Sequence, residues 1–251
     1  MTLLVKLNLH ALQVCFISFY FICYLYLLLS SVSNIPREIL SLSQHLSLPR
    51  LPEYISLFLY GQSHSELDIP LDDIPIEDCP IYHGKIFVYP SAVSTFYAPS
   101  DLSGIEGMLR ERIRSVDSWR GGAEWHDSVF FVHDESLPGF RGLHVARVRL
   151  FFKIKHYGVT YPCALVTWFS AIDDKPCEDT GMWMVKPDVD SSGERNMSVI
   201  HLDSILRGAH LIGISGDERI PQHIDHTNSL DAFQGFYVNK YIDYHAHEIG
   251  F

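Results

Sequence analysis

The spacing of apolar residues changes several times along the chain, and it begins with an uninterrupted apolar run. No formal charge lies between Lys6 and Arg37, and residues 11–32 are almost entirely apolar. A helix that crosses a bilayer needs about 20 such residues, so the run predicts a single membrane-spanning helix. Ser31 and Ser33 also fit a signal-peptidase site, which is an alternative interpretation of the same segment.

Helical spacing continues in residues 37–60, where Pro49 and Pro52 divide the pattern into short helices. Residues 67–81 then repeat an acidic Asp-Ile-Pro unit. Proline at that frequency excludes a helix and favours an extended path. We interpret this segment as a strap over the domain surface; a binding peptide is the alternative.

From residue 85 onward the pattern is typical of β-strands. Branched and aromatic residues dominate residues 85–98 and 127–134. Residues 143–172 are rich in branched and aromatic residues on both sides of Tyr157 and Gly158, and apolar and basic residues alternate in the first arm. This pattern predicts a long hairpin whose turn lies at these two residues.

Further short strands are predicted in residues 181–188 and 197–214, which brings the total to about five to seven strands. From Asn228 onward, apolar residues at helical spacing predict a C-terminal helix. The predicted fold is mainly β with helices (α+β): a small barrel- or sandwich-like β domain with a C-terminal helix, preceded by an apolar N-terminal helix. We predict three parts. A hydrophobic leader covers residues 1–36, short helices with the acidic strap cover residues 37–84, and the β domain with its terminal helix covers residues 85–251.

The overall charge argues against a broadly basic surface. The chain has 30 acidic and 19 basic residues and a formal net charge of −11. Contact with nucleic acid therefore requires a locally basic face. The cysteines outside the leader, Cys79, Cys163 and Cys177, form no C-x-x-C pair, which argues against a zinc ribbon and favours a reduced intracellular protein.

One strand of the hairpin carries such a basic face. On a regular strand, alternate side chains lie on the same side. Four cations would therefore share one side of this strand: Arg147, Arg149, Lys153 and Lys155. The apolar residues would share the other side: Val148, Leu150, Phe152 and Ile154. These cations form a candidate contact for phosphate groups or for a protein partner. The ordinary alternative is a solvated outer face whose positive charges oppose aggregation.

A second basic group lies at Arg110, Arg112 and Arg114, in a stretch interpreted as helical. We add these arginines to the candidate nucleic-acid contacts. Asp101, Glu106 and Glu111 are nearby carboxylates, but surface pairing with the arginines is a better explanation for them than a two-metal nuclease site.

The last residues of the chain contain four potential metal ligands. On a helix Asp243 and His247 share a face, whereas His245 points elsewhere and no third ligand lies nearby. A solvated helix end with histidines near the negative end of its dipole is the simpler interpretation. Ser215 lacks the glycine that a nucleophile elbow needs two residues later. We therefore predict no catalytic residue, metal site, cofactor or small-molecule substrate.

Trp168, Phe169 and Trp183 form a candidate stacking platform or aromatic cage, although packing in the core is their more usual role. Asn196 begins a glycosylation sequon, which matters only if the leader exports the chain.

Five blocks of the sequence, taken in order, resemble one known family. They are "FYAPSDLSGIEGMLRERIRS", "YPCALVTWFS", "DTGMWMVKPD", "SVIHLDSILRGAHLI" and "DAFQGFYVNKYIDYHAHEIGF". The family is the C-terminal region of fungal Plavaka-type, CACTA-like transposase proteins, and the resemblance runs from about Leu51 to the last residue. The layout around "VTWFS" is also similar to bromo-adjacent homology modules, which implies a small β domain that binds chromatin or protein partners.

The resemblance implies that the metal-dependent RNase H-like core of the family lies upstream of the matching region. We therefore expect this chain to lack it and to be a non-catalytic accessory module that contacts protein or nucleic acid. The leader is then either a genuine membrane anchor or a gene-model artefact. The expected location is a membrane in the first case, and the nucleus or cytoplasm in the second.

Overall fold

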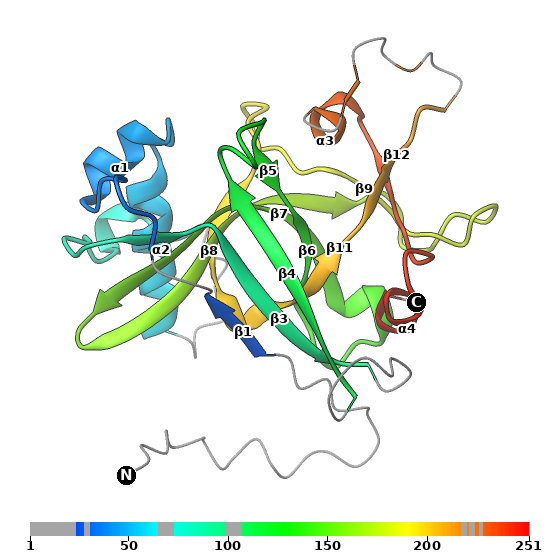
Figure 1. The fold of residues 1–251 in the computed structure, drawn as a ribbon, viewed down its shortest axis with the longest axis horizontal. Helices are drawn as coiled ribbons and strands as arrows, with labels where there is room; N and C mark the ends of the chain where they lie inside the picture. The colour runs from blue at the N-terminus through cyan, green and yellow to red at the C-terminus, as the bar shows by residue number, and fades with distance from the viewer. Residues whose placement is uncertain are drawn as a thin grey trace.

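The computed structural model describes residues 24–27, 31–64, 73–98, 107–216, 220, 224–225 and 228–250 (Figure 1). The helices are α1 (Ile39–His45), α2 (Leu51–Ser63), α3 (Ser229–Ala232) and α4 (Tyr244–Gly250), with short 3-10 helices η3 (Ile76–Asp78), η4 (Gly139–Gly142) and η5 (Leu202–Ser204). The strands are β1 (Tyr24–Leu27), β2 (Phe87–Tyr89), β3 (Ser91–Tyr97), β4 (Met108–Val116), β5 (Trp125–His126), β6 (Ser128–Val132), β7 (Leu143–His156), β8 (Val159–Ala171), β9 (Met184–Pro187), β10 (Met197–His201), β11 (Ile205–Ala209), β12 (Leu211–Gly213) and β13 (Phe236–Val238).

The β7–β8 hairpin is the centre of the fold. Its two long antiparallel strands pair from Val145 opposite Phe169 to His156 opposite Val159. Within the described residues the larger sheet has the order β11-β6-β7-β8-β9-β13-β12, with β2 added to β7 and β10 added to β8. A second antiparallel sheet, β1-β3-β4-β5, lies across the first, and together they form a nearly closed barrel (Figure 1).

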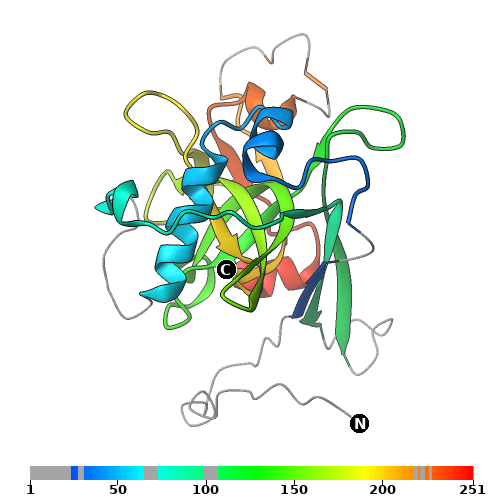
Figure 2. The same cartoon turned by 90° about the vertical axis from the view of Figure 1, so that its left-hand side faces the viewer.

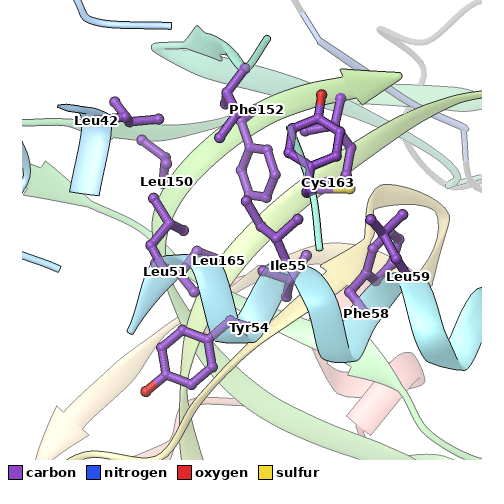
Figure 3. Packing of buried hydrophobic residues seen from close by; sticks show 14 of the residues in the cluster. Leu42, Leu51, Tyr54, Ile55, Phe58, Leu59, Leu150, Phe152, Cys163 and Leu165 are labelled. Carbon is purple, nitrogen blue, oxygen red and sulfur yellow. The ribbon is translucent and has the colours of Figure 1, made fainter. Parts of the chain in front are cut away.

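Helix α2 covers one side of the hairpin (Figure 2). Leu51, Ile55 and Leu59 recur every four residues, so they lie on one face of the helix, and each is at most 1% exposed. Figure 3 shows this face against the strand residues Leu150, Phe152, Cys163 and Leu165. The two N-terminal helices therefore share a core with the β domain.

A second apolar cluster fills the space between the two sheets. Ala92 of β3 and Ile113 of β4 pack there with Val129, Val148 and Phe151 of the larger sheet. All five side chains are at most 1% exposed. This cluster is the barrel interior, and it joins the two sheets into one body.

The predicted fold class, mainly β with helices and a C-terminal helix, is confirmed. The predicted hairpin turn is also confirmed, since Tyr157 and Gly158 both have positive φ between β7 and β8. The continuous helix predicted from Asn228 is wrong, because α3 ends at Ala232 and residues 236–238 pair with β9 and β12 instead. The spacing of apolar residues predicted a helix here, but the backbone N–H and C=O groups of residues 236–238 pair with the neighbouring strands instead.

Most of the predicted leader helix lies outside the described residues. The part that the structure describes, Tyr24–Leu27, is strand β1 and pairs with β3, so the helix prediction is wrong for these four residues. No helix among the described residues is long and apolar enough to cross a membrane. The first part of the predicted strap, residues 67–72, also lies outside the description, and its remainder contains the single turn η3.

Candidate nucleic-acid interface and binding cleft

The arginines predicted to lie on a helix are on strand β4. Arg110, Arg112 and Arg114 occupy alternate positions, so their side chains leave the same face of the strand, about 7 Å apart. Across the strand pair they face Thr95, Val93 and Ser91 of β3. Arg110 and Arg112 are exposed, and within the described residues neither forms an ion pair. We call these three residues the β4 arginine stripe.

Two tryptophans lie at one end of the β4 arginine stripe. The Arg114 guanidinium lies 4.8 Å from the centroid of the Trp119 ring, and the Arg120 guanidinium lies 5.4 Å from it. The Trp119 and Trp125 centroids are 6.5 Å apart, and Trp125 is 38% exposed. Its indole N–H donates to Asp127 at 2.6 Å, which fixes the orientation of the ring.

Glu111 points to the opposite side of β4 from the arginines. Its Oε2 accepts a hydrogen bond from the Gly208 backbone N–H at 2.9 Å and lies 3.6 Å from Arg207 Nε. The predicted surface pairing of Glu111 with neighbouring arginines is therefore wrong, because a strand sends adjacent side chains to opposite faces. The other two carboxylates of that prediction, Asp101 and Glu106, lie outside the described residues.

The four cations of β7 do not share one face. Val148 pairs with Val166 and Leu150 pairs with Leu165, so Arg149 is an extra residue in a β-bulge. One extra residue inverts the alternation that follows it, and Phe151 accordingly joins Val148 in the barrel interior. The single basic face predicted from the sequence is wrong.

The same four cations also differ in exposure. Arg147 is only 5% exposed, and its Nη1 lies 2.9 Å from Asp231 Oδ2. Lys153 Nζ lies 5.7 Å from the Phe87 ring centroid, while Lys155 is exposed near the hairpin tip. Arg149 is half-buried. A ligand cannot contact all four residues along one surface.

The carboxylate of Asp243 binds a buried arginine. Arg207 is 3% exposed, and its two terminal nitrogens lie 3.0 and 2.6 Å from the two Asp243 oxygens. Asp243 also accepts a hydrogen bond from the Ala246 N–H in the first turn of α4. This carboxylate anchors the C-terminal helix to β11, and no group of three or more metal-type ligands is found in the described part of the chain.

A cleft of about 980 Å³ lies where β6 ends, β7 begins and β8 ends. Phe131 and Trp168 meet edge to face at 5.1 Å, and the rings of His133 and His144 lie 4.5 Å apart. The Trp168 indole N–H donates to Ser198 Oγ at 2.8 Å. The cleft therefore has aromatic walls, and the hydrogen bond to Ser198 fixes the orientation of the Trp168 ring.

The charges that line the cleft are mainly negative. Asp173, Asp174 and Asp188 line it together with a single arginine, Arg141. Partial burial lowers the pKa of His144, and the neighbouring His133 lowers it further, so the His144 imidazole adds little positive charge near neutral pH. The cleft can accommodate an apolar or aromatic group that carries a positive charge.

The three aromatic residues suggested from the sequence all line this cleft, but they differ in burial. Trp168 is half-buried, whereas Phe169 is 2% and Trp183 is 7% exposed, and both belong to a core cluster. Trp183 stacks on Phe140 at 5.0 Å. Of these three, Trp168 is thus the one most exposed to the cleft, and Phe169 and Trp183 support the wall behind it.

Several residues of these sites were not singled out from the sequence. Trp119 and Trp125 lie on either side of the turn at Arg120 and Gly121, both of which have positive φ. The glycine pair at residues 121–122 marks that turn in the sequence, and this was the available signal. Of the cleft histidines, His133 follows the end of β6 and His144 lies on β7, so no local spacing connects them.

Comparison of the chain with models of protein families, with curated proteins and with solved structures finds no match in any of the three.

Proposed function

We propose that the domain is a non-catalytic accessory module of a transposon-derived protein and that it binds single-stranded nucleic acid through the β4 arginine stripe. The observation that carries the proposal is the placement of Arg110, Arg112 and Arg114 on one face, next to Trp119 and Trp125. Cations spaced along a strand suit a run of backbone phosphates, and aromatic rings beside them suit stacked bases. The family resemblance supports the accessory role.

Charge and side-chain chemistry favour this face over the rest of the surface. The chain has a net charge of −11, so most of its surface repels phosphates. The positions of β3 that lie opposite the three arginines carry no charge, so no carboxylate of β3 neutralises them; on the other side of β4, Asp127 lies near Arg114. Arginine also binds phosphate with two parallel hydrogen bonds, which lysine cannot do.

Binding of a fluorescent single-stranded oligonucleotide, measured at several salt concentrations, tests the proposal. For single strands the logarithm of the binding constant falls with the logarithm of salt with a slope of about −0.7 per neutralised phosphate. Replacing Arg110, Arg112 and Arg114 by Gln removes up to three contacts, so we expect the slope to become shallower by about 2. The control is Arg50→Gln together with Lys175→Gln, which removes two cations that are exposed and already paired with carboxylates.

Two results would count against the nucleic-acid proposal. In the first, the wild-type protein does not retain the oligonucleotide at low salt. In the second, the β4 variant and the control lose binding equally, which means that the contact depends on total charge. Tighter binding of a duplex than of a single strand would retain the stripe as the interface and reject the stacking role of the tryptophans.

The cleft favours a second candidate function, the binding of a protein partner. Its three aspartates and its aromatic wall suit a lysine or arginine side chain presented by that partner. Intrinsic tryptophan fluorescence titrated with N-acetyl-arginine amide tests this, with the uncharged isostere N-acetyl-citrulline amide as the control. We expect only the charged compound to change the emission, and Asp173→Asn with Asp174→Asn to weaken its effect. Equal responses to the two compounds would reject a cation site.

The alternative of a single-pass membrane protein depends on the leader, residues 1–36. Mapping the 5′ end and splicing of the transcript tests whether these codons are translated in frame. Their presence favours a membrane location, and their absence favours a nuclear or cytoplasmic one. If the protein is exported, Asn196 is expected to carry a glycan that a glycosidase removes, and an unshifted band would argue against a lumenal domain.

A further inference from the structure

Three arginines gather beside α3 around a single carboxylate. Arg147 of β7 lies 2.9 Å from Asp231, and Arg195 lies 4.0 Å from the other oxygen of the same carboxylate. Arg149, the bulge residue, is half-buried two positions after Arg147. We call Arg147, Arg149 and Arg195 the arginine cluster. It shares no residue with the β4 arginine stripe, and it borders the cleft, since Arg195 donates to the Trp168 carbonyl at 3.2 Å and its guanidinium lies 4.9 Å from the Phe169 ring centroid.

The arginine cluster contains hydrogen-bond donors that the described residues leave unsatisfied. Nε of Arg147 and Nε of Arg195 are buried and have no acceptor among those residues, and the same is true of Ser128 Oγ. Ser128 lies directly opposite Arg147 in the β6–β7 pairing, so its hydroxyl lies beside that arginine. Native proteins rarely bury unpaired donors, and three in one place indicate that an acceptor binds there.

Only one carboxylate contacts the cluster directly. Within the described residues Asp231 is the only acid within ion-pair distance of Arg147 or Arg195, and Arg149 has none at that distance. Asp117 and Glu124 attract Arg149, and Asp188 attracts Arg195, from farther away. Burial lowers the pKa of Arg149 and that of Arg195, and repulsion from Arg147 adds to both effects. Glu124 also hydrogen-bonds to His126 at 3.2 Å. Buried guanidinium groups whose N–H donors lack a direct acceptor are costly unless an anion binds them.

We propose that the arginine cluster binds a phosphate group and that the Asp231 carboxylate occupies part of the position of that group. A phosphate monoester carries about −1.5 to −2 charges near neutral pH, more than the single carboxylate that now contacts the cluster. Its oxygens accept several hydrogen bonds in different directions, as the two Nε–H groups and the Ser128 hydroxyl require. A single carboxylate from α3 satisfies only part of this donor set.

A phosphate can reach the cluster from the side of α3. The side chain of Asp231 is 53% exposed and that of Arg195 is 25% exposed, whereas that of Arg147 is 6% exposed at the bottom of the site. The cluster therefore extends from the surface into the domain, with its most buried cation innermost. An entering phosphate would contact Arg195 and displace Asp231 before it contacts Arg147.

Thermal unfolding of the full chain in sodium phosphate, compared with sodium chloride of equal ionic strength, tests this proposal. We expect a saturable rise in melting temperature with phosphate and no such rise with chloride. Asp231→Asn removes the competing charge with little change in shape, and we expect it to tighten phosphate binding about tenfold. Arg195→Gln removes a partly exposed donor, and we expect it to abolish the phosphate-specific rise.

The controls separate this site from other positive surfaces. Arg50→Gln removes an exposed, paired arginine, and replacement of the β4 arginine stripe by Gln removes the proposed nucleic-acid contact. Both variants are expected to keep the full response to phosphate, so the proposed function and the phosphate site fail independently. Glycerol 3-phosphate, tested in parallel, distinguishes an esterified ligand from free phosphate. A response that survives Arg195→Gln, or the absence of any response in both the wild type and Asp231→Asn, would overturn the proposal.

Discussion

The contact between Arg207 and Asp243 allows the most specific test of the fold. Arg207 is buried and Asp243 is partly exposed, with side-chain exposures of 4% and 37%. Asp243→Asn keeps the shape of the side chain and its ability to accept the Ala246 N–H, so α4 keeps its cap. The change removes the negative charge that compensates Arg207 and replaces the oxygen that accepts from Arg207 Nη2 by an amide NH2 group.

The size of the effect follows from burial. Breaking a fully buried pair typically costs about 3–5 kcal/mol, because the remaining charge is left without compensation. Solvent screens Asp243, and Glu111 lies 3.6 Å from Arg207, so both reduce the cost. We expect Asp243→Asn to lower the free energy of unfolding by ~2 kcal/mol near neutral pH, which for a chain of this size is about 4–8 °C in melting temperature.

The effect also has a defined dependence on pH. Burial on its own would raise the pKa of Asp243, but hydrogen bonds from Arg207 and from the Ala246 N–H outweigh it and hold the pKa below its ordinary value of 3.8. A carboxylate whose pKa is lowered by folding stabilises the fold above its unfolded pKa. This contribution is lost as the pH falls below 3.8 through the folded pKa.

Urea unfolding of the wild type and of Asp243→Asn at a series of pH values is the assay. The difference in unfolding free energy should be largest above pH 5 and should shrink toward pH 3. Glu178→Gln is the matched control, because its side chain is 82% exposed, and we expect it to change stability by no more than about 0.5 kcal/mol. A difference between the wild type and Asp243→Asn that does not vary with pH would refute the assignment.

Three further outcomes are expected. Ile55→Ala opens a cavity between α2 and the hairpin and should lower the free energy of unfolding by about 2–5 kcal/mol in urea; a loss below 1 kcal/mol would show that α2 does not pack there. Gly158→Ala places a Cβ at φ +85° and should cost about 1 kcal/mol by thermal unfolding, and an unchanged melting temperature would contradict this turn. Iodoacetamide should label Cys177 well before Cys163, as read by peptide mass mapping. A hydrogen bond with Thr180 lowers the pKa of the Cys177 thiol, whereas burial raises the pKa of the Cys163 thiol. Equal labelling of the two cysteines would be inconsistent with the burial of Cys163.

Local patterns in the sequence predicted the elements that local chemistry controls. Branched and aromatic residues on both sides of Tyr157 and Gly158, with alternation in the first arm, predicted the β7–β8 hairpin because strand-forming composition and a turn residue are both properties of neighbouring residues. The division of residues 37–60 by proline was likewise recovered as α1 and α2. The same reasoning failed at Arg110–Arg114, where the alternation of arginine with apolar and acidic residues was interpreted as a helix.

The candidate sites were predicted less well, because they depend on partners that are distant in the chain. Nothing in the order of residue types along β7 indicates the bulge at Arg149, yet the bulge places Arg147 and Lys155 on opposite faces of the sheet. Arg147 was taken as a surface cation, but it is buried beside Asp231, 84 residues later. No spacing within one segment reveals such a pair.

The sequence alone determined a mainly β chain with a long central hairpin, short N-terminal helices and a negative overall charge, since periodicity and composition are local or summed quantities. Only the tertiary structure decided which charges face solvent. Glu111 turns inward to Gly208, Arg207 binds Asp243, and the β4 arginine stripe stays on the surface. The physical reason is that burial and pairing of charge depend on which strands are neighbours, and strand order brings together residues that the chain keeps far apart.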